Sequence, residues 1–410
     1  MTGPTTHAAC GELDAADPLT PLRDQFVLPE DTIYLDGNSL GALPRAARDR
    51  VRRMVDDEWG QGLIRSWNTA GWFDKPAELG DLLAPVVGAE PGSIVVCDST
   101  SINLFKAFTA ALQMRADRRV VVAERGSFPT DLYMMEGATG MLEGYRRRLI
   151  GDGGPTLAEA LDNEVAVVVL SHVDYRTGAL HDMATVTEQI HRSGALAIWD
   201  LCHSVGALQV RLAEARADFA VGCTYKYLNG GPGSPAFVYV APRHHGAARQ
   251  PLSGWHGHAD PFAFTTGYAP ATGIDSFRCS TPQLLSYAPL EASLRMWQHI
   301  DLDAVRAKSA RMTSLFIDLV EQRCDGLGLE LVSPRAPGSR GSQVALCHES
   351  SYPIMQALIA RGVIGDFRAP DVMRFGFAPL YLRHVDVWDA VEALREVLTT
   401  GTWREDRYAV

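Results

Sequence analysis

The chain has 410 residues, of which 46% are hydrophobic and 21% charged, so it can bury a sizeable core and is long enough for a large domain plus a smaller one. Its formal net charge of −11 argues against nucleic acid as the main partner, because binding to phosphates needs a clustered cationic surface. We also expect no membrane partner, since no apolar run approaches the roughly 20 residues that span a bilayer. Residues 1–17 lack the basic and apolar segments of a secretory signal.

The seven cysteines are scattered along the chain without a C-x-x-C pair. This spacing fits neither a disulfide framework nor a zinc site, so we expect free thiols in a reducing cytosol and a cytoplasmic protein. The two histidines of GWHGH (254–258) could suggest a metal, but no third ligand stands at a recognisable spacing. We therefore expect no metal site.

The first expected elements follow a polar stretch, residues 1–30, which predicts an arm rather than a domain. Four elements come next: a short strand breaking into a turn over 33–41, a helix from Pro44 to about Glu58, an irregular Gly- and Trp-rich stretch over 59–72, and a short helix over 79–87. Pro44 supports the helix start, because proline suits the first turn of a helix.

From residue 93 the pattern alternates between strands and helices. Strands are expected at 94–97, 120–123, 165–170, 195–199, 219–223 and 236–240, and helices at 101–114 and 183–192. Strands that are apolar on both faces and separated by helices predict an α/β fold with a parallel or mixed sheet covered on both sides. The ligand site of such a sheet lies beyond the carboxyl ends of its strands, where Ser99, Ser171, Asp200 and Lys226 all fall.

The pattern changes after Pro289. We expect a long helix over 290–323, strands at 329–334 and 342–348, a helix over 352–361, a strand over 373–377 and a last helix over 385–398. This predicts a smaller α+β domain. The expected division is an arm over 1–30, a large domain over 31–289 and a small C-terminal domain over 290–410.

Two residues at strand ends suggest a cofactor with a cationic end and a carbonyl end. Lys226 follows an apolar strand, where a charged amine is costly to bury, and an imine with an aldehyde would turn that amine into an electrophile. A lone lysine there would more often be solvated. Asp200 could pair with a pyridine nitrogen, although an acid before a helical stretch is also a common N-cap. His203 follows on the next turn, where an isolated histidine would more often be a core residue.

Two further segments could hold the rest of such a cofactor. Hydroxyls and helix N-terminal amides at Ser99-Thr100-Ser101 can converge on an anion, and a plain helix cap explains that segment equally well. Phe128, in FPTD (128–131), offers a flat ring that could stack on a heteroaromatic group. Ser171 could reach the other face of that group.

The order of these motifs resembles pyridoxal-phosphate enzymes of fold type I, with a large, mostly parallel sheet domain and a smaller C-terminal domain. More narrowly, the chain resembles the kynureninases. The matching motifs are YLDGNSLG (34–41), WGQGLIRSWN (59–68), STSINLF (99–105), FPTD (128–131), DYRTG (174–178), DLCHSVGAL (200–208), YKYLNGGPGSP (225–235), GWHGH (254–258) and RFGFAPLY (374–381). The match extends from about residue 20 to 400, and YLDGNSLG and YKYLNGGPG are its specific parts.

This resemblance implies a role for each matching residue. Lys226 would hold pyridoxal 5'-phosphate as an imine and then move protons at the substrate α-carbon, Asp200 would pair with the pyridinium nitrogen, and Tyr225 would donate a proton. The remaining cofactor contacts implied are Thr100, Ser101, Phe128, Pro129, Thr130, Asp131, Ser171 and His203, together with Trp255 and Thr281, which such homodimers lend from the neighbouring subunit. The substrate contacts implied are Arg374, which grips the α-carboxylate, Trp67 and Ser39.

The implied reaction is the hydrolysis of L-kynurenine, an amino acid, to anthranilate and L-alanine. Water adds to the γ-ketone, the Cβ–Cγ bond breaks, and the pyridinium system takes up the electrons. Animal kynureninases carry a histidine near the position of Trp67 and an asparagine at that of Thr281. Because both changes remove groups that could hydrogen-bond a ring hydroxyl, we expect a preference for kynurenine over 3-hydroxykynurenine.

Three alternatives stand beside this interpretation. One is a related enzyme that acts on a substituted kynurenine in a biosynthetic pathway. Another is a different fold type I lyase such as a desulfurase, which would need a reactive cysteine on a mobile loop, whereas Cys347 falls in an expected strand. The third is a non-catalytic regulatory protein. It could dispense with Lys226 and Arg374, and it would carry a basic DNA-reading segment, which the sequence lacks.

Overall fold

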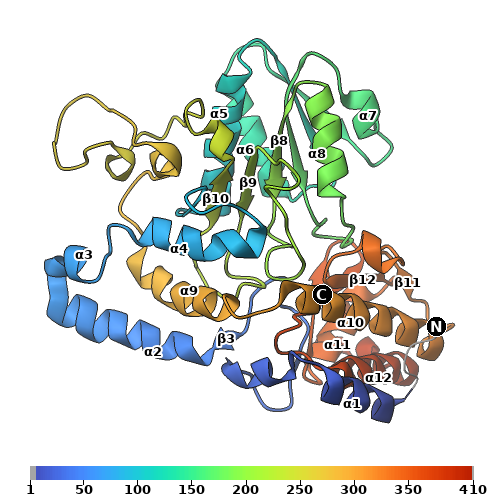
Figure 1. Ribbon diagram of the computed structural model, residues 1–410. Helices are drawn as coiled ribbons and strands as arrows, with labels where there is room; N and C mark the ends of the chain where they lie inside the picture. The colour runs from blue at the N-terminus through green and yellow to red at the C-terminus, as the bar shows by residue number, and fades with distance from the viewer. Residues whose placement is uncertain (1–5, 409–410) are drawn as a thin grey trace.

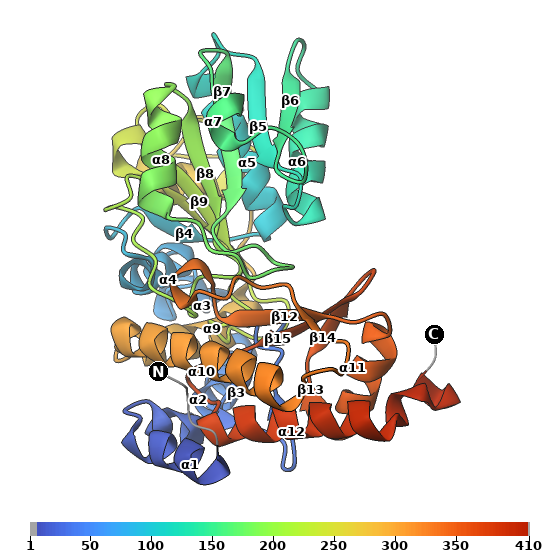
Figure 2. The ribbon, with the colours of Figure 1, turned by 90° about the vertical axis from the view of Figure 1, so that its right-hand side faces the viewer.

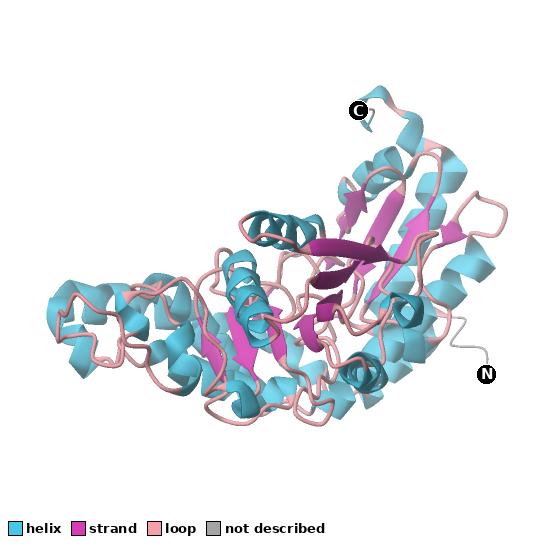
Figure 3. Cartoon of the chain, turned by 90° about the horizontal axis from the view of Figure 1, so that it is seen from above, coloured by secondary structure: helices cyan, strands magenta, loops and turns pink. Residues whose placement is uncertain are grey.

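The computed structural model describes residues 6–408 and is built around two sheets, which Figure 3 shows as separate groups of strands. The larger sheet has seven strands in the spatial order β4-β10-β9-β8-β7-β5-β6. Their bounds are β4 (Ile94–Val96), β5 (Val120–Glu124), β6 (Arg146–Ile150), β7 (Val165–Ser171), β8 (Leu196–Asp200), β9 (Phe219–Gly222) and β10 (Phe237–Val240). The five strands β6, β5, β7, β8 and β9 run parallel to one another, and β10 pairs antiparallel with β9 and β4. The predicted mixed sheet is therefore confirmed.

Helices cover both faces of this sheet. Alternate residues of β5 and β7 point into different cores: Val122 and Val168 share one with Ile190 of α8, while Val121 and Val167 share the other with Phe108 of α5. Figure 2 shows α8 on one side of the strands and α5 on the other. The helices of this part are α4 (Lys75–Leu83), α5 (Thr100–Met114), α6 (Pro129–Gly140), α7 (Leu157–Ala160) and α8 (Met183–Arg192).

The smaller sheet is antiparallel, in the order β11-β12-β15-β14. Its strands are β11 (Glu330–Leu331), β12 (Gln343–Cys347), β14 (Asp366–Arg368) and β15 (Val372–Gly376), and its helices are α10 (Leu302–Arg323), α11 (Ser351–Ile359) and α12 (His384–Thr400). These elements occupy the lower right of Figure 1, away from the larger sheet. The residue boundaries of the two expected domains remain a prediction.

The N-terminal segment is ordered along the smaller sheet rather than extended as a free arm. Helix α1 (His7–Ala16) packs against α12, and two buried contacts fix it: an ion pair of Asp17 with Lys308 at 2.6 Å, and a hydrogen bond between Asp14 and His384 at 2.8 Å. Strand β2 (Ile33–Tyr34) then pairs in parallel with β13 (Val363–Ile364), and β1 (Phe26–Val27) pairs with β3 (Leu43–Pro44). The turn after β2 therefore lies against the C-terminal part of the chain.

Two expected elements were wrong. The single helix over 290–323 is two helices, α9 (Leu284–Trp297) and α10, because Asp301 caps the start of the second by accepting from the Asp303 amide at 2.9 Å. The stretch 59–72 is helical where we expected irregular structure: α2 (Arg45–Arg53) continues into a π-helix to Gly62, followed by a 3₁₀ turn and α3 (Ser66–Thr69). Side-chain donors such as Ser66, which bonds the Glu58 carbonyl at 2.6 Å, satisfy its backbone. Among residues 6–408, no helix has the length and apolar character needed to cross a bilayer.

Candidate active site

Lys226 lies on a tight turn after β9, where the loop from the N-terminal part meets it. The Asn229 amide donates to the Lys226 carbonyl at 2.8 Å, and the Gly41 amide donates to the Tyr225 carbonyl at 2.8 Å. A Cβ atom at Gly41 would lie 2.2 Å from the Lys226 carbonyl oxygen. The approach of the two backbones therefore requires glycine at position 41, which explains why YLDGNSLG and YKYLNGGPG occur together.

The Lys226 amine faces a buried histidine. Its Nζ lies 2.8 Å from Nε2 of His203, and Nδ1 of His203 lies 3.2 Å from Oε1 of Gln343 on β12. Burial, together with the charges of Lys226 and Arg374, lowers the pKa of His203 well below its ordinary value. The ring is therefore neutral, and its two nitrogens form hydrogen bonds with Lys226 on one side and with Gln343 of the smaller sheet on the other.

Two carboxylates lie close to this lysine. Asp200 ends β8 opposite Ser171 of β7, and one of its oxygens accepts from the Cys202 amide at 2.8 Å, which leaves its second oxygen for another donor. Asp131 lies in the first turn of α6, which Pro129 and Thr130 begin. Burial and the charge of Asp200 raise the pKa of Asp131 well above its ordinary value, and its buried Oδ2 has no hydrogen-bond partner among residues 6–408. The pair is suited to a cationic N–H group.

The N-terminus of α5 forms the anionic end of the site. Ser99 caps the helix by accepting from the Ile102 amide at 3.4 Å, and Thr100 and Ser101 follow in its first turn. Ser99, Ile102 and Tyr225 line one cavity of about 620 Å³. The charge of Cys223 and burial raise the pKa of Tyr225, so its phenol keeps its proton at neutral pH.

Arg374 and Phe128 are connected through Tyr175. The Arg374 guanidinium is 1% exposed and donates to the Tyr175 carbonyl, while the Tyr175 ring meets the Phe128 ring edge to face at 5.2 Å. Phe128 is 43% exposed, so its ring is only partly covered within the described chain. A flat group beside Lys226 and an anion at Arg374 could thus be bound side by side.

The charge of Arg374 is paired inside the protein. Asp366 stands directly opposite it on β14 and accepts from Arg374 Nε at 2.7 Å and from Ser39 Oγ at 2.8 Å. Ser39 and Arg374 are also in contact, at 3.4 Å. Although burial would raise the pKa of Asp366, its bonds and charge interaction with Arg374 lower it below the ordinary value. Asp366 therefore fixes the guanidinium in place as a charged partner.

A second acid beside this pair titrates unusually. Burial and the charge of Asp366 raise the pKa of Asp36 to about 6, and its buried Oδ1 has no hydrogen-bond partner in the described part of the chain. Because the folded pKa exceeds the unfolded value of about 3.9, the stabilising effect of protonation is fully present below about pH 3.9 and is lost as the pH rises through 6.

We therefore expect Asp36→Asn, which is uncharged at every pH, to melt at a higher temperature than the wild type at pH 8 and to lose most of this advantage at pH 4. Thermal melts at the two pH values measure the difference. Asp24→Asn, at an exposed acid of the same segment, serves as the control and is expected to change neither melt. An equal shift at both pH values would contradict the titration of Asp36.

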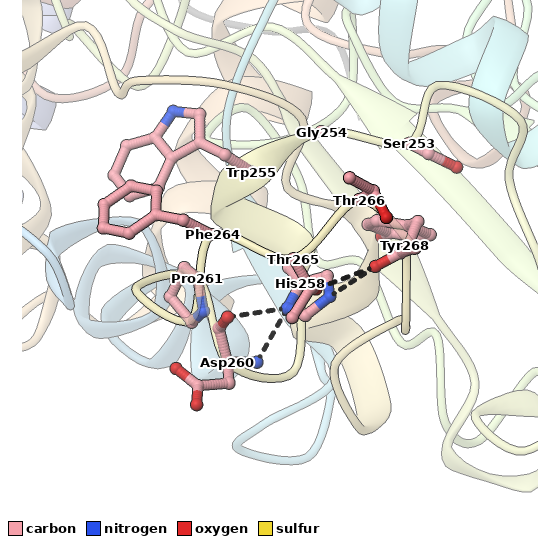
Figure 4. A pocket seen from close by; sticks show the side chains of 11 residues that line it. Ser253, Gly254, Trp255, His258, Asp260, Pro261, Phe264, Thr265, Thr266 and Tyr268 are labelled. Carbon is pink, nitrogen blue, oxygen red and sulfur yellow. Dashed lines mark hydrogen bonds between the residues drawn. The ribbon is translucent and has the colours of Figure 1, made fainter.

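Three residues implied by the resemblance are not brought to Lys226 within the described chain. Trp67 of α3 and Trp255 pack against each other with ring centroids 6.0 Å apart, and Thr281 is exposed. The loop 253–268 that carries Trp255 projects away from both sheets in Figure 1. It forms its own pocket, in which His258 Nδ1 bonds the backbone of Asp260 (Figure 4). His256 Nε2 lies 3.0 Å from the Phe73 carbonyl oxygen, so each histidine has a backbone partner.

Three residues of the site were missed by the sequence analysis. Tyr175 stands inside DYRTG, a matching motif that could have indicated it. Asp366 and Gln343 stand outside every motif, and only strand pairing in the smaller sheet brings them to the site. The complete set fits a group with an aldehyde for Lys226, a protonated ring nitrogen for Asp131 and Asp200, a flat face for Phe128 and an anionic end for α5.

Comparison with known proteins agrees with this chemistry. A family model described as "Kynureninase C-terminal domain" matches residues 305–394. The chain is 54% identical over 402 residues to a kynureninase of Burkholderia pseudomallei, covering 97% of this chain and 96% of that protein. It is 52% identical over 411 residues to a kynureninase of Pseudomonas fluorescens, covering 99% of both chains.

Solved structures show the same fold at low sequence identity. A cysteine desulfurase from Thermococcus onnurineus NA1 superposes with a TM-score of 0.78 at 18% identity, covering 93% of this chain and 98% of the other. A variant of C-DES with glycine linked covalently to its PLP cofactor superposes with a TM-score of 0.79 at 19% identity, covering 91% and 99%. These similarities identify the architecture as that of fold type I pyridoxal-phosphate enzymes.

Proposed function

The chain belongs to the kynureninase family, and we propose that it hydrolyses L-kynurenine to anthranilate and L-alanine in the cytoplasm, as a step of tryptophan catabolism. It is a hydrolase, and its cofactor is pyridoxal phosphate. The observation that carries the proposal is the arrangement at Lys226: its amine lies 2.8 Å from a neutral histidine, with a pair of buried acids close by.

Residues already described would hold the cofactor. Lys226 would bind its aldehyde, Asp200 and Asp131 its ring nitrogen, and the N-terminus of α5 with Tyr225 its phosphate. When bound, the cofactor supplies an electron sink for the bond that breaks in the substrate. The buried, unpartnered oxygen of Asp131 supports this assignment, because a ring N–H would satisfy it.

The chain's own groups would bind the substrate and move its protons. Arg374, fixed by Asp366 and touching Ser39, would bind the α-carboxylate of the substrate. Lys226 would take and return the proton at the α-carbon. Tyr225, which keeps its proton at neutral pH, would donate one as the Cβ–Cγ bond breaks.

The test of this function is direct. Incubation of the purified protein with L-kynurenine should release anthranilate, detected by its fluorescence, together with an equal amount of L-alanine. Absence of anthranilate from a protein with bound cofactor would favour a related enzyme with another substrate. A desulfurase is disfavoured by Cys347, which lies in β12 and whose pKa is raised by burial, so that little reactive thiolate forms.

The substrate ring should be unsubstituted. In the proposed homodimer, Thr281 and Trp67, which packs against Trp255, would reach the site from the neighbouring subunit, and they would offer a short hydroxyl and an aromatic wall where a ring hydroxyl needs a longer polar partner. We expect kcat/KM for kynurenine to exceed that for 3-hydroxykynurenine by about tenfold or more. Parallel steady-state kinetics on the two substrates measure this ratio, and a clear preference for the hydroxylated substrate would refute the prediction.

The active enzyme should be a homodimer with shared active sites. Trp255, Phe262 and Phe264 are exposed by 36%, 64% and 86%, which is unusual for large aromatic side chains and typical of a surface that a partner covers. We expect sedimentation to give twice the monomer mass. We also expect Phe264→Ser, which removes the most exposed of these rings, to weaken the dimer and lower activity more strongly at low protein concentration.

A further inference from the structure

Gln343 connects the lysine side of the site to the arginine side. It begins β12, is 1% exposed, and lies opposite Gly376 in the sheet. Its Oε1 lies 3.2 Å from His203 Nδ1, and its Nε2 donates to the carbonyls of Tyr175 at 2.9 Å and Asp174 at 3.3 Å. The Tyr175 carbonyl also accepts from Arg374. One side chain of the smaller sheet therefore contacts two loops of the larger one.

The partners of Gln343 determine the orientation of its amide. Both backbone carbonyls can only accept hydrogen bonds, so the amide nitrogen must face them and the amide oxygen must face His203. An amide oxygen can only accept, which requires a proton on Nδ1 of His203. Because the ring is neutral, Nε2 then carries no proton and presents its lone pair to Lys226.

We propose that Gln343 is a positioning residue for the reaction: it fixes the Nδ1–H tautomer of His203, which makes Nε2 an acceptor for the Lys226 amine. This rests on the proposed function only in assigning Lys226 the role of the reacting amine. With Nε2 as acceptor, the free lysine donates an N–H and keeps its own lone pair available. The opposite tautomer would donate an N–H to that lone pair, which the lysine needs in order to act as a base or nucleophile.

Gln343→Leu removes the hydrogen bond that fixes the tautomer of His203 and leaves few other groups without a partner. The carbonyls that Gln343 binds keep other donors, since Arg374 bonds the Tyr175 carbonyl and the Gly178 amide bonds the Asp174 carbonyl at 2.9 Å. Only Nδ1 of His203 would lose its partner. The ring would then gain by moving its proton to Nε2, where the lysine lone pair can accept it.

The tautomer can be observed directly. Long-range ¹H–¹⁵N spectra of the full chain labelled with ¹⁵N-histidine and freed of cofactor, so that the Lys226 amine is free, should show a protonated Nδ1 and a bare Nε2, with the His203 signals identified from a His203→Asn variant. In Gln343→Leu the pattern should shift toward a protonated Nε2. A protonated Nε2 in the wild type, or an unchanged pattern in the variant, would overturn the proposal. These spectra do not depend on the substrate. They can therefore confirm or refute the tautomer of His203 even if the protein releases no anthranilate.

Kinetics distinguish this role from a structural one. We expect Gln343→Leu to lower kcat by about 10- to 100-fold, the loss typical when the outer partner of a metal-ligating histidine is removed, with a smaller change in KM. Ser342→Ala is the matched control: it is equally buried, adjacent on the chain, and loses bonds to Ser309 and Phe377 without reaching His203. Equal losses of kcat in both variants would show that Gln343 serves only the packing of the sheet.

Discussion

Lys226→Ala is expected to abolish kynurenine hydrolysis, with a loss of at least about 1,000-fold in kcat. In the proposed function this amine binds the cofactor covalently and moves the α-proton, and the other nitrogen beside it, Nε2 of His203, belongs to a neutral ring that cannot form an imine. Anthranilate fluorescence measures the activity. The absorbance of the lysine-bound cofactor should disappear at the same time.

The control for Lys226→Ala is the adjacent Tyr227→Phe. Tyr227 is 2% exposed and its hydroxyl donates to the Ser342 carbonyl at 2.9 Å, so its loss should cost about 1 kcal/mol of stability and leave the activity of the folded enzyme close to that of the wild type. Comparable loss in both variants would mean that the turn is sensitive to any change. Hydrolysis that persists in Lys226→Ala would refute the role of the lysine.

Arg374→Gln is expected to raise KM for kynurenine by at least about 100-fold, because the substrate carboxylate loses its charged partner. The same change removes one of the two arginines paired with Asp366, while Arg368 stays 2.8 Å from its Oδ2, so we expect a cost of about 1–3 kcal/mol in stability. The single variant therefore combines two defects. Steady-state kinetics and urea unfolding measure them separately.

The double variant Arg374→Gln, Asp366→Asn separates the two effects. Removing both charges should restore part of the lost stability, because no buried carboxylate is left with only one of its two arginines, and Arg368, which loses its partner, is 39% exposed. KM should stay high, since the cation for the substrate is still missing. Recovery of KM along with stability would show that Arg374 acts only as the structural partner of Asp366.

Sequence patterns within a single segment allowed correct predictions of its secondary structure. Features that depend on contacts between distant segments were not predicted. The apolar run at 165–170 predicted β7 because both of its faces are buried, and the expected helix over 183–192 matches α8. The position of Lys226 after an apolar run likewise predicted that it lies beyond the carboxyl end of a strand, which is β9.

The missed features depend on partners far away in the sequence. The start of α10 depends on Asp301, a cap within a run of helix-compatible residues. Gln343 became part of the site only through the pairing of β12 with β15, which places it beside a histidine 140 positions earlier. A buried amide in an apolar strand carries no local signal of its hydrogen-bond partners, so no reading of that segment alone could assign it a role.

The pairing of β2 with β13 has a consequence for synthesis on the ribosome. Residue 33 finds its strand partner at residue 363, and Asp36 bridges Gly376, so the turn that supplies Ser39 and Gly41 cannot settle until almost the whole chain has emerged. The seven-stranded sheet can form earlier from residues 94–240. The nascent chain would therefore assemble the cofactor-binding strands first, and the earliest translated segment would complete the substrate-binding half last.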